Sequence, residues 1–525
     1  MTHSLFRVSS AQGRAFLAVC ALFVAHRLTL ALTIGLAPEE AYYWTWSQNL
    51  DLSYFDHPPL VAYTIRALTE IFGQSVFTIH LSALLWSTLT FMALALFTER
   101  ISGSKAAAYA SVVWLATPLT QLGGFVITPD APLIALLALT FVTFHDIALA
   151  SRQGSSPPRP WALVGFLLGL ATLAKYTALI GVLGIALYMT LDSQGRRHWR
   201  GLGPYVAALI YTATISPLLL WNARHAWASF AFQSSHRVGQ FEGFDFSGVL
   251  SFLGTQSALV GPGVLLFVLI WIFTRIPTSL DNTSESPSPD LTYRTLALYW
   301  GLPLALLCLG LSGFYWVKMN WAAPLYALAL PAFGAWLQRS LSERRRFGLN
   351  RVSALVAIVS TGLVGVVCAI GLWTPLRADL APLNTTVGWR ELAQRVGDAR
   401  ERMRRKDYNP LIIGWDYKVA SELSYHLRDN LDSGETVLCG ETLDGEGLQF
   451  ALWSGNLERL RGRDAILVYD TRAITRPPFL RPYFYSFDNI DTLTARWSED
   501  SVTTFLITYA FDFRPYGRRW GPDGR

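Results

Sequence analysis

Acidic side chains stand at two places where a long apolar run ends or begins. Glu39 and Glu40 follow the first apolar run directly, and Asp130 follows Thr128 and Pro129 at the start of another. Carboxylates at the end of a membrane helix are costly unless they are hydrated, paired or bound to a cation. They can act as a general base or hold a divalent ion. We predict a shared acidic site, the alternative being two solvated acids and an ordinary helix start.

The chain after Glu40 is first aromatic and then rigid. Tyr43 belongs to an aromatic run that suits a helix lying in the membrane interface. Asp56 and His57 precede two prolines, which fix their own φ and push the preceding residue towards extended geometry. A stiff loop suits a ligand-positioning element. The alternative is a rigid turn over the helix ends.

Cationic residues occur in the connections that we expect on the same side as these acids. Lys175 lies between two apolar segments, where its ammonium either reaches outward or pairs with an anion such as a lipid phosphate. Arg27, inside the first run, is expected to pair with polar groups of neighbouring helices. A further set suits phosphate or pyrophosphate and comprises Asn222, Arg224, His225, His236 and Arg237, with Lys318 as an addition.

The composition indicates a membrane protein with a soluble end. Of 525 residues, 52% are hydrophobic and 15% are charged, and the mean hydropathy is +0.31, whereas soluble domains carry about 25% charged residues. Charges are sparse through 1–375 and ordinary in 376–525, which predicts a transmembrane domain followed by one soluble domain. The net charge of +6 is modest and its basic residues cluster in short loops, which does not favour nucleic-acid binding. The four cysteines show no disulfide or metal-site spacing.

A spanning helix needs about 20 predominantly apolar residues. About eleven segments qualify, namely 15–36, 76–98, 106–125, 131–150, 161–174, 177–191, 204–221, 249–274, 295–313, 322–337 and 351–373. Basic residues cluster in alternate connections, which predicts a cytoplasmic N-terminus and a C-terminal domain outside. The Ser/Pro-rich stretch 278–290 is expected to be a mobile cytoplasmic linker.

The soluble part reads as an α/β domain. Its β-type runs lie at 411–414, 436–439, 465–469 and 503–508, and its helical patterns at 389–405 and 417–427.

Four motifs of this chain resemble those of a known family. They are Glu-Glu-Ala-Tyr-Tyr-Trp at 39–44, Ser-Tyr-Phe-Asp-His-Pro-Pro at 53–59, Thr-Pro-Asp at 128–130 and Ala-Lys-Tyr at 174–176. They resemble the bacterial branch of the GT-C glycosyltransferases, the relatives of dolichyl-phosphate-mannose protein mannosyltransferase and of the lipid A aminoarabinose transferase. The likeness covers about 1–375 and is specific in the first loop.

The resemblance implies roles for particular residues. Glu39 and Glu40 take the places of a catalytic Asp-Glu pair, so Glu39 departs from the usual Asp. Asp56 becomes a metal or substrate ligand together with Glu39, and His57 a contact to the donor phosphate. Asp130 becomes a second acid of the site. The resemblance also implies that Lys175 contacts the phosphate. His80 departs from the family, because many relatives have Arg at this position.

We therefore expect a polytopic α-helical GT-C membrane protein with a periplasmic α/β domain, in a bacterial inner membrane. It would be an inverting hexosyl or pentosyl transferase that uses a polyprenyl-phosphate sugar. The acceptor would be lipid A or core, another envelope glycan, or a protein. A divalent cation (Mg, Mn or Zn) is compatible with the clustered carboxylates but not required by them.

Two other readings stay open. A transporter or flippase would place its polar residues near the bilayer midplane on broken helices, usually with repeat symmetry. The sequence shows no internal repeat, and its polar residues lie at helix ends. A glycan polymerase or ligase would use the same acidic and basic residues in its outer loops and would differ in its acceptor.

Overall fold

The structure is a computed structural model that describes residues 11–152, 158–236, 241, 243–273, 289–342, 348–374, 383–472 and 483–514. Arg237 and most of the expected linker 278–290 lie outside these residues, and His236 is described in its backbone alone. The chain forms two compact units. The first comprises Met1–Leu32, His57–Thr64 and His80–Ala369, and the second Thr33–Asp56, Ile65–Ile79 and Ile370–Arg525.

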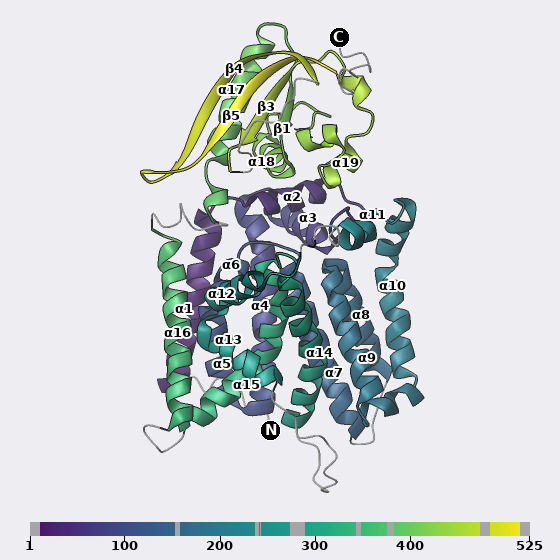
Figure 1. Ribbon diagram of the computed structural model, residues 1–525, viewed down its shortest axis with the longest axis vertical. Helices are drawn as coiled ribbons and strands as arrows, with labels where there is room; N and C mark the ends of the chain where they lie inside the picture. The colour runs from purple at the N-terminus through teal and green to yellow at the C-terminus, as the bar shows by residue number, and fades with distance from the viewer. Residues whose placement is uncertain are drawn as a thin grey trace. The chain divides into compact units, whose positions relative to one another are not determined.

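The first unit is helical, because its apolar segments satisfy their backbone hydrogen bonds internally only as helices. Its long helices run side by side (Figure 1). The helices that lie wholly or mainly in this unit are α1 (Ala11–Thr33), α4 (Val76–Ser102), α5 (Ser104–Ala116), α6 (Pro118–Gly123), α7 (Asp130–Arg152), α8 (Pro158–Ala174), α9 (Leu179–Leu191), α10 (Gly203–Arg224), α11 (Ala228–Ala231), α12 (Phe246–Val260), α13 (Pro262–Phe273), α14 (Pro289–Ser312), α15 (Ala323–Ser342) and α16 (Leu349–Gly371). Short turns join them at η1 (Tyr176–Ala178), η2 (Gly195–Arg200), η3 (Phe232–His236) and η4 (Met319–Ala322).

Two segments that were expected to be single helices are broken, so their predicted continuity was wrong. The segment 106–125 separates into α5 and α6 at Thr117, which is extended and precedes Pro118. The segment 249–274 separates into α12 and α13 at Gly261, whose φ is +87°, and the two pieces are bent by 116°. Both breaks precede a proline, which has no N–H to donate and clashes with the preceding turn.

The described helices fit a chain that crosses a membrane several times. Five of them are long and apolar enough to span, or up to seven if each bent pair is one span. The shorter apolar helices Pro158–Ala174 and Tyr176–Leu191 come in addition. The expected count of about eleven spans and the outer location of the C-terminal domain stay predictions.

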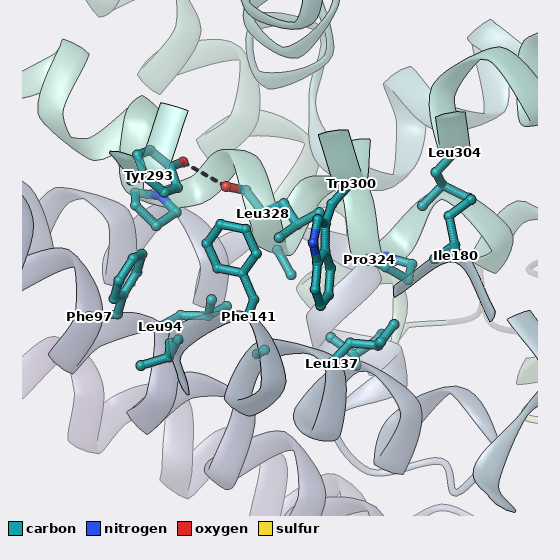
Figure 2. Close-up of a pocket in the computed structure, with 15 residues that line it drawn as sticks. Leu94, Phe97, Leu137, Phe141, Ile180, Tyr293, Trp300, Leu304, Pro324 and Leu328 are labelled. Carbon is teal, nitrogen blue, oxygen red and sulfur yellow. Dashed lines mark hydrogen bonds between the residues drawn. The ribbon is translucent and has the colours of Figure 1, made fainter. Parts of the chain in front are cut away.

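The interior of the first unit is a packed apolar core. Between α4, α7, α14 and α15 the largest side chains leave a cavity of only about 20 Å³ (Figure 2). Phe141 and Trp300 line it, and the Tyr293 hydroxyl donates to the Leu328 carbonyl oxygen at 2.6 Å. This space holds no more than about one water molecule, so it is too small for a sugar or a lipid phosphate.

The second unit contains a mixed five-stranded sheet in the order β2-β1-β3-β5-β4. Its strands are β1 (Leu411–Gly414), β2 (Leu438–Cys439), β3 (Ala465–Asp470), β4 (Phe484–Trp497) and β5 (Asp500–Phe513). β1 pairs in parallel with β2 and β3, while β5 is antiparallel to β3 and β4. The long hairpin of β4 and β5 extends beyond the shorter parallel strands (Figure 1).

The helices of the second unit include parts of the first loop. They are α2 (Pro38–Gln48), most of α3 (Leu60–Phe72), α17 (Trp389–Arg404), α18 (Tyr417–Leu427) and α19 (Gln449–Trp453). The predicted strands and the helices α17 and α18 are confirmed to within a few residues. α3, α19 and β4 were not predicted. β4 pairs with β5 alone and has register shifts at Asp488/Ile490 and Ala495/Arg496, which weaken the alternating pattern that marks a strand.

Candidate functional site

In the first unit, the predicted acid and the predicted cation form a buried ion pair. Lys175 Nζ donates to both carboxylate oxygens of Asp130 at 2.8 Å. The two residues are 7% exposed each. Asn320 Nδ2 donates a third hydrogen bond, at 2.6 Å, to Oδ2 of Asp130. The partner that the structure gives to Lys175 is therefore a protein carboxylate.

Breaks in the helices place these three side chains. The chain is extended at Lys175 (φ −159°, ψ 140°), between α8 and η1, which confirms the predicted break. Asp130 is the first residue of α7, after the predicted turn at Thr128 and Pro129. Asn320 lies in η4, ahead of α15. All three residues thus lie at or next to helix ends, and their side chains meet there.

A cavity of about 90 Å³ adjoins this ion pair. Asp130, Asn320, Thr120 and Thr128 line it together with Arg27. Arg27 is 6% exposed, and its Nε and Nη2 have no hydrogen-bond partner among the described residues. The expectation that Arg27 pairs with polar groups of neighbouring helices is therefore wrong for these two atoms. Two cations and one carboxylate leave a net positive charge, which suits an anion.

The cationic set of 222–237 is only partly assembled. The His225 ring stacks on Trp221, with centroids 4.1 Å apart, and its Nδ1 lies 2.9 Å from the Trp221 carbonyl oxygen. Arg224 is exposed at the end of α10. The same segment contacts Tyr176 at the Lys175 break, where the Tyr176 hydroxyl lies 2.5 Å from that of Ser229 and its ring lies 5.2 Å from that of Phe230. The structure thus does not bring Arg224 and His225 into the lining of the Asp130 cavity.

Four remaining polar residues of this region are placed as follows. Asn222 is buried and donates to the Leu218 carbonyl oxygen at 3.1 Å. Lys318 is exposed at the start of η4. His57 is half-buried in the first unit. His80 is fully buried, and its Nδ1 lies 2.9 Å from the Ala31 carbonyl oxygen. His80 thus links α4 to α1.

In the second unit, the two adjacent acids have different surroundings. Glu40 is fully buried, and its carboxylate accepts a hydrogen bond from the Ala37 N–H at 3.1 Å. Glu39, one residue earlier in the first turn of α2, has a side chain that is 39% exposed. Its Oε1 lies 2.9 Å from Nζ of Lys418 in α18. Glu40 is therefore used to start the helix, whereas Glu39 remains accessible to a substrate.

The part of the first loop that belongs to the second unit contacts α19. Asp56 is buried and accepts a hydrogen bond from the Tyr42 hydroxyl at 2.9 Å. That hydroxyl accepts from the Gln449 N–H at 3.0 Å. Tyr43 is buried and meets Trp46 edge to face, with centroids 5.1 Å apart. Asp56 and Tyr43 therefore shape the loop, and both are shielded from solvent.

The predicted metal ligands Glu39 and Asp56 do not fit a metal site as they stand. Glu39 faces an ammonium and Asp56 a tyrosine hydroxyl. Within the part of the chain that the structure describes, no three His, Cys, Asp or Glu residues are grouped as metal ligands. A divalent ion needs several oxygen ligands together. We therefore derive no reaction step through a metal.

Sequence reasoning missed three residues of these sites. Asn320 stood in an expected outer loop, where a single amide carries no recognisable signal. Lys418 and Gln449 lie in the tail, which was treated as a separate domain. Their contacts to α2 and its loop arise from packing between segments far apart in the sequence. The local sequence pattern around each residue does not indicate such contacts.

Comparisons with known proteins find similarity to glycosyltransferases. Residues 56–221 match the family model of dolichyl-phosphate-mannose-protein mannosyltransferase. The chain is 25% identical over 326 residues to the lipid A galacturonosyltransferase RgtD of Rhizobium johnstonii. That match covers 62% of this chain and 65% of the relative's length.

Solved structures show the same fold. The ArnT structure from Cupriavidus metallidurans, bound to undecaprenyl phosphate, has a TM-score of 0.59 at 15% identity and covers 95% of this chain and 98% of that one. The Archaeoglobus fulgidus oligosaccharyltransferase in its apo form has a TM-score of 0.54 at 12% identity, covering 87% and 70%. The chain is thus a multi-pass membrane protein with a C-terminal sheet domain, and its fold resembles that of ArnT and of the archaeal oligosaccharyltransferase.

Proposed function

We propose that this chain is an inner-membrane glycosyltransferase that takes a sugar from a polyprenyl-phosphate donor and passes it to a hydroxyl of an envelope glycolipid. The undecaprenyl phosphate bound to ArnT supports the class of donor. The lipid A galacturonosyltransferase supports a glycolipid as the acceptor. The observation that carries the proposal is the accessible carboxylate of Glu39 beside the buried one of Glu40.

Glu39 would be the general base. It takes the proton from the acceptor hydroxyl while the acceptor oxygen forms a bond to the anomeric carbon of the sugar. The bond from that carbon to the phosphate oxygen breaks, and polyprenyl phosphate leaves with the bond's electron pair. A single displacement of this kind inverts the anomeric configuration, so we propose an inverting enzyme.

Asp130 is less suited to be the base, because it is buried and both its carboxylate oxygens accept hydrogen bonds, whereas the Glu39 side chain is 39% exposed beside its ion pair with Lys418. We assign it the role of holding Lys175. Arg27 and Lys175 give the first unit an excess of positive charge beside its cavity. Cations of this kind stabilise the charge that develops on a departing phosphate. We propose that these residues serve the donor phosphate.

A transfer assay tests the function. The purified protein in proteoliposomes receives radiolabelled polyprenyl-phosphate sugars and an envelope lipid extract that contains lipid A. We expect label in a new glycolipid and release of polyprenyl phosphate. Donor that crosses the bilayer without a new glycosidic product would favour a transporter and refute the proposal. Label in protein or in a glycan polymer would keep the enzyme class and correct the acceptor.

A further inference from the structure

Helix α18 of the second unit packs directly on α2, which carries the acidic pair. The rings of Tyr42 and Tyr417 lie 4.9 Å apart, and those of Trp44 and Tyr425 lie 5.0 Å apart. Asp416 caps the start of α18 by accepting from the N–H groups of the two residues at positions 418 and 419. Aromatic contacts and a cap therefore fix how α18 faces α2.

Two ionisable side chains of α18, four residues apart, point at the same neighbour. Residues spaced by four lie on one face of a helix. Lys418 makes the ion pair with Glu39 at 2.9 Å. Burial lowers the pKa of Lys418, but the Glu39 carboxylate opposes it and the net shift is upward, so the ammonium is charged at neutral pH.

Glu422 is the second of these side chains. It is fully buried, and neither carboxyl oxygen has a hydrogen-bond partner among the residues that the structure describes. Burial raises its pKa well above the ordinary value, and the charges of Glu40 and then Glu39 raise it further. An ionised carboxylate without partners is costly in such a place. The burial of Glu422 therefore favours its protonated form.

The other groups around Glu422 do not change this state. His426 Nε2 lies 3.4 Å from its Oε2. Burial lowers the pKa of His426 to about 4, so the imidazole brings no positive charge to Glu422 at neutral pH. The charge of Arg472 acts in the opposite direction and is the weakest of the influences on Glu422. α18 thus presents one cation, and one carboxyl group whose burial favours its protonated form, to the two carboxylates of α2.

We propose that α18 completes the acidic site, with Lys418 holding the Glu39 carboxylate in position and Glu422 setting the surroundings of Glu40. Both are positioning residues. The inference rests on the proposed function, since it assumes that Glu39 acts on the acceptor. It gives the C-terminal part of the chain a direct part in the reaction.

Lys418 is tested in the full-length protein with Lys418→Met, Lys418→Arg and the exposed control Lys406→Met. A misplaced base costs up to about 100-fold in rate. We expect Lys418→Met to lower kcat at least about tenfold with KM within about twofold, since the lost interaction acts on the reacting group. Arg should restore most of kcat, and the control should equal wild type. An unchanged kcat, or a loss that Arg does not restore, would overturn the role.

The role of Glu422 is tested by measuring whether its carboxyl group is protonated. The infrared spectrum of the wild type should contain a protonated-carboxyl band at neutral pH that is lost in Glu422→Gln and kept in the exposed control Glu499→Gln. The transfer rate should also fall on the alkaline side of the pH profile, and this fall should begin at a lower pH in the wild type than in Glu422→Gln. The reason is that only the wild type has a carboxyl group at position 422 that can ionise. Glu422→Met gives the same band test if the Gln variant does not fold. An unchanged band or identical alkaline limbs would refute the role of Glu422.

These results separate the inference from the proposed function. A wild type without transfer from any donor would contradict the function itself. An active wild type, with Lys418 and Glu422 variants that match it in kcat, spectrum and pH profile, would contradict the inference alone.

Discussion

Lys175 Nζ donates to both carboxylate oxygens of Asp130 at 2.8 Å, although the two residues are 45 positions apart in the sequence. Because the two side chains are buried, neither charge can be removed without leaving the other uncompensated. The pair therefore fixes the ends of α7 and α8 relative to each other within the first unit. It also holds both oxygens of the Asp130 carboxylate in a buried place, whereas the Glu39 side chain is 39% exposed, which leaves Glu39 as the better candidate for the base.

Breaking this pair should destabilise the protein. Removal of one partner of a buried ion pair costs about 3–5 kcal/mol, so Asp130→Asn and Lys175→Met should each lower the thermal unfolding temperature in detergent. The double variant should lose less than the sum of the two. The exposed pair of Arg100 and Asp146 is the control, because surface pairs contribute about 0–1 kcal/mol. Strict additivity of the two changes would contradict a direct pairing.

Arg27 should contribute to binding of the lipid phosphate. A hydrogen bond to a charged group is worth about 1.5–3 kcal/mol, so Arg27→Gln should weaken the binding of undecaprenyl phosphate about tenfold or more. Arg27→Lys should lie between the two, because it keeps the charge but not the planar donor set. Titration calorimetry in detergent measures the affinity, with Arg100→Gln as the control. Equal affinity in Arg27→Gln and wild type would remove Arg27 from the site.

Gly123 and Gly124 line the cavity beside Asp130, and substitutions of these two glycines test how closely it is packed. A Cβ at Gly124 would lie 2.4 Å from the Thr120 carbonyl oxygen and 2.8 Å from Nε of Arg27, whereas a Cβ at Gly123 would meet nothing within 4 Å. Gly124→Ala should therefore displace Arg27, lower the unfolding temperature and weaken undecaprenyl phosphate binding. Gly123→Ala should leave both unchanged. If the two variants behaved alike, the close packing at Gly124 would be refuted.

The stability of the second unit should fall between about pH 4.5 and pH 7. Burial, followed by the charge of Asp416, raises the pKa of Glu441 from its ordinary 4.5 to about 7. In this window the folded state holds a proton that the unfolded state has released, so the free energy of unfolding decreases as the pH rises. Glu441→Gln removes this component.

The difference in unfolding temperature between Glu441→Gln and wild type isolates the effect of this group. It should grow in favour of the variant from pH 4.5 to pH 7 and stay constant above. A difference that is independent of pH would show that Glu441 titrates at its ordinary pKa.

The sequence predicted most of the helices because apolar length is a strong signal, as in α4, α7 and α16. It did not predict α3, which is amphipathic and follows the rigid prolines, nor the breaks at Thr117 and Gly261. There a local proline outweighed the apolar pattern.

The candidate site was predicted in part. Asp130 and Lys175 were both named, but as an acid beside a phosphate-binding cation, whereas the structure pairs them with each other. Glu39 and Glu40 read alike in the sequence, and only packing shows that one is buried and the other accessible. Lys418 and Glu422 became visible only through the contact of α18 with α2, because contacts between distant segments leave no mark on local periodicity.

The central claim is that Glu39 is the base of the transfer reaction, and single-turnover transfer by Glu39→Gln tests it most directly. General base catalysis contributes about 10²–10⁴-fold. We therefore expect Glu39→Gln to lose at least about 100-fold in transfer rate while it still binds undecaprenyl phosphate and unfolds at a temperature close to that of the wild type. Glu39→Asp should retain part of the rate. Turnover by Glu39→Gln near the wild-type rate would contradict the account.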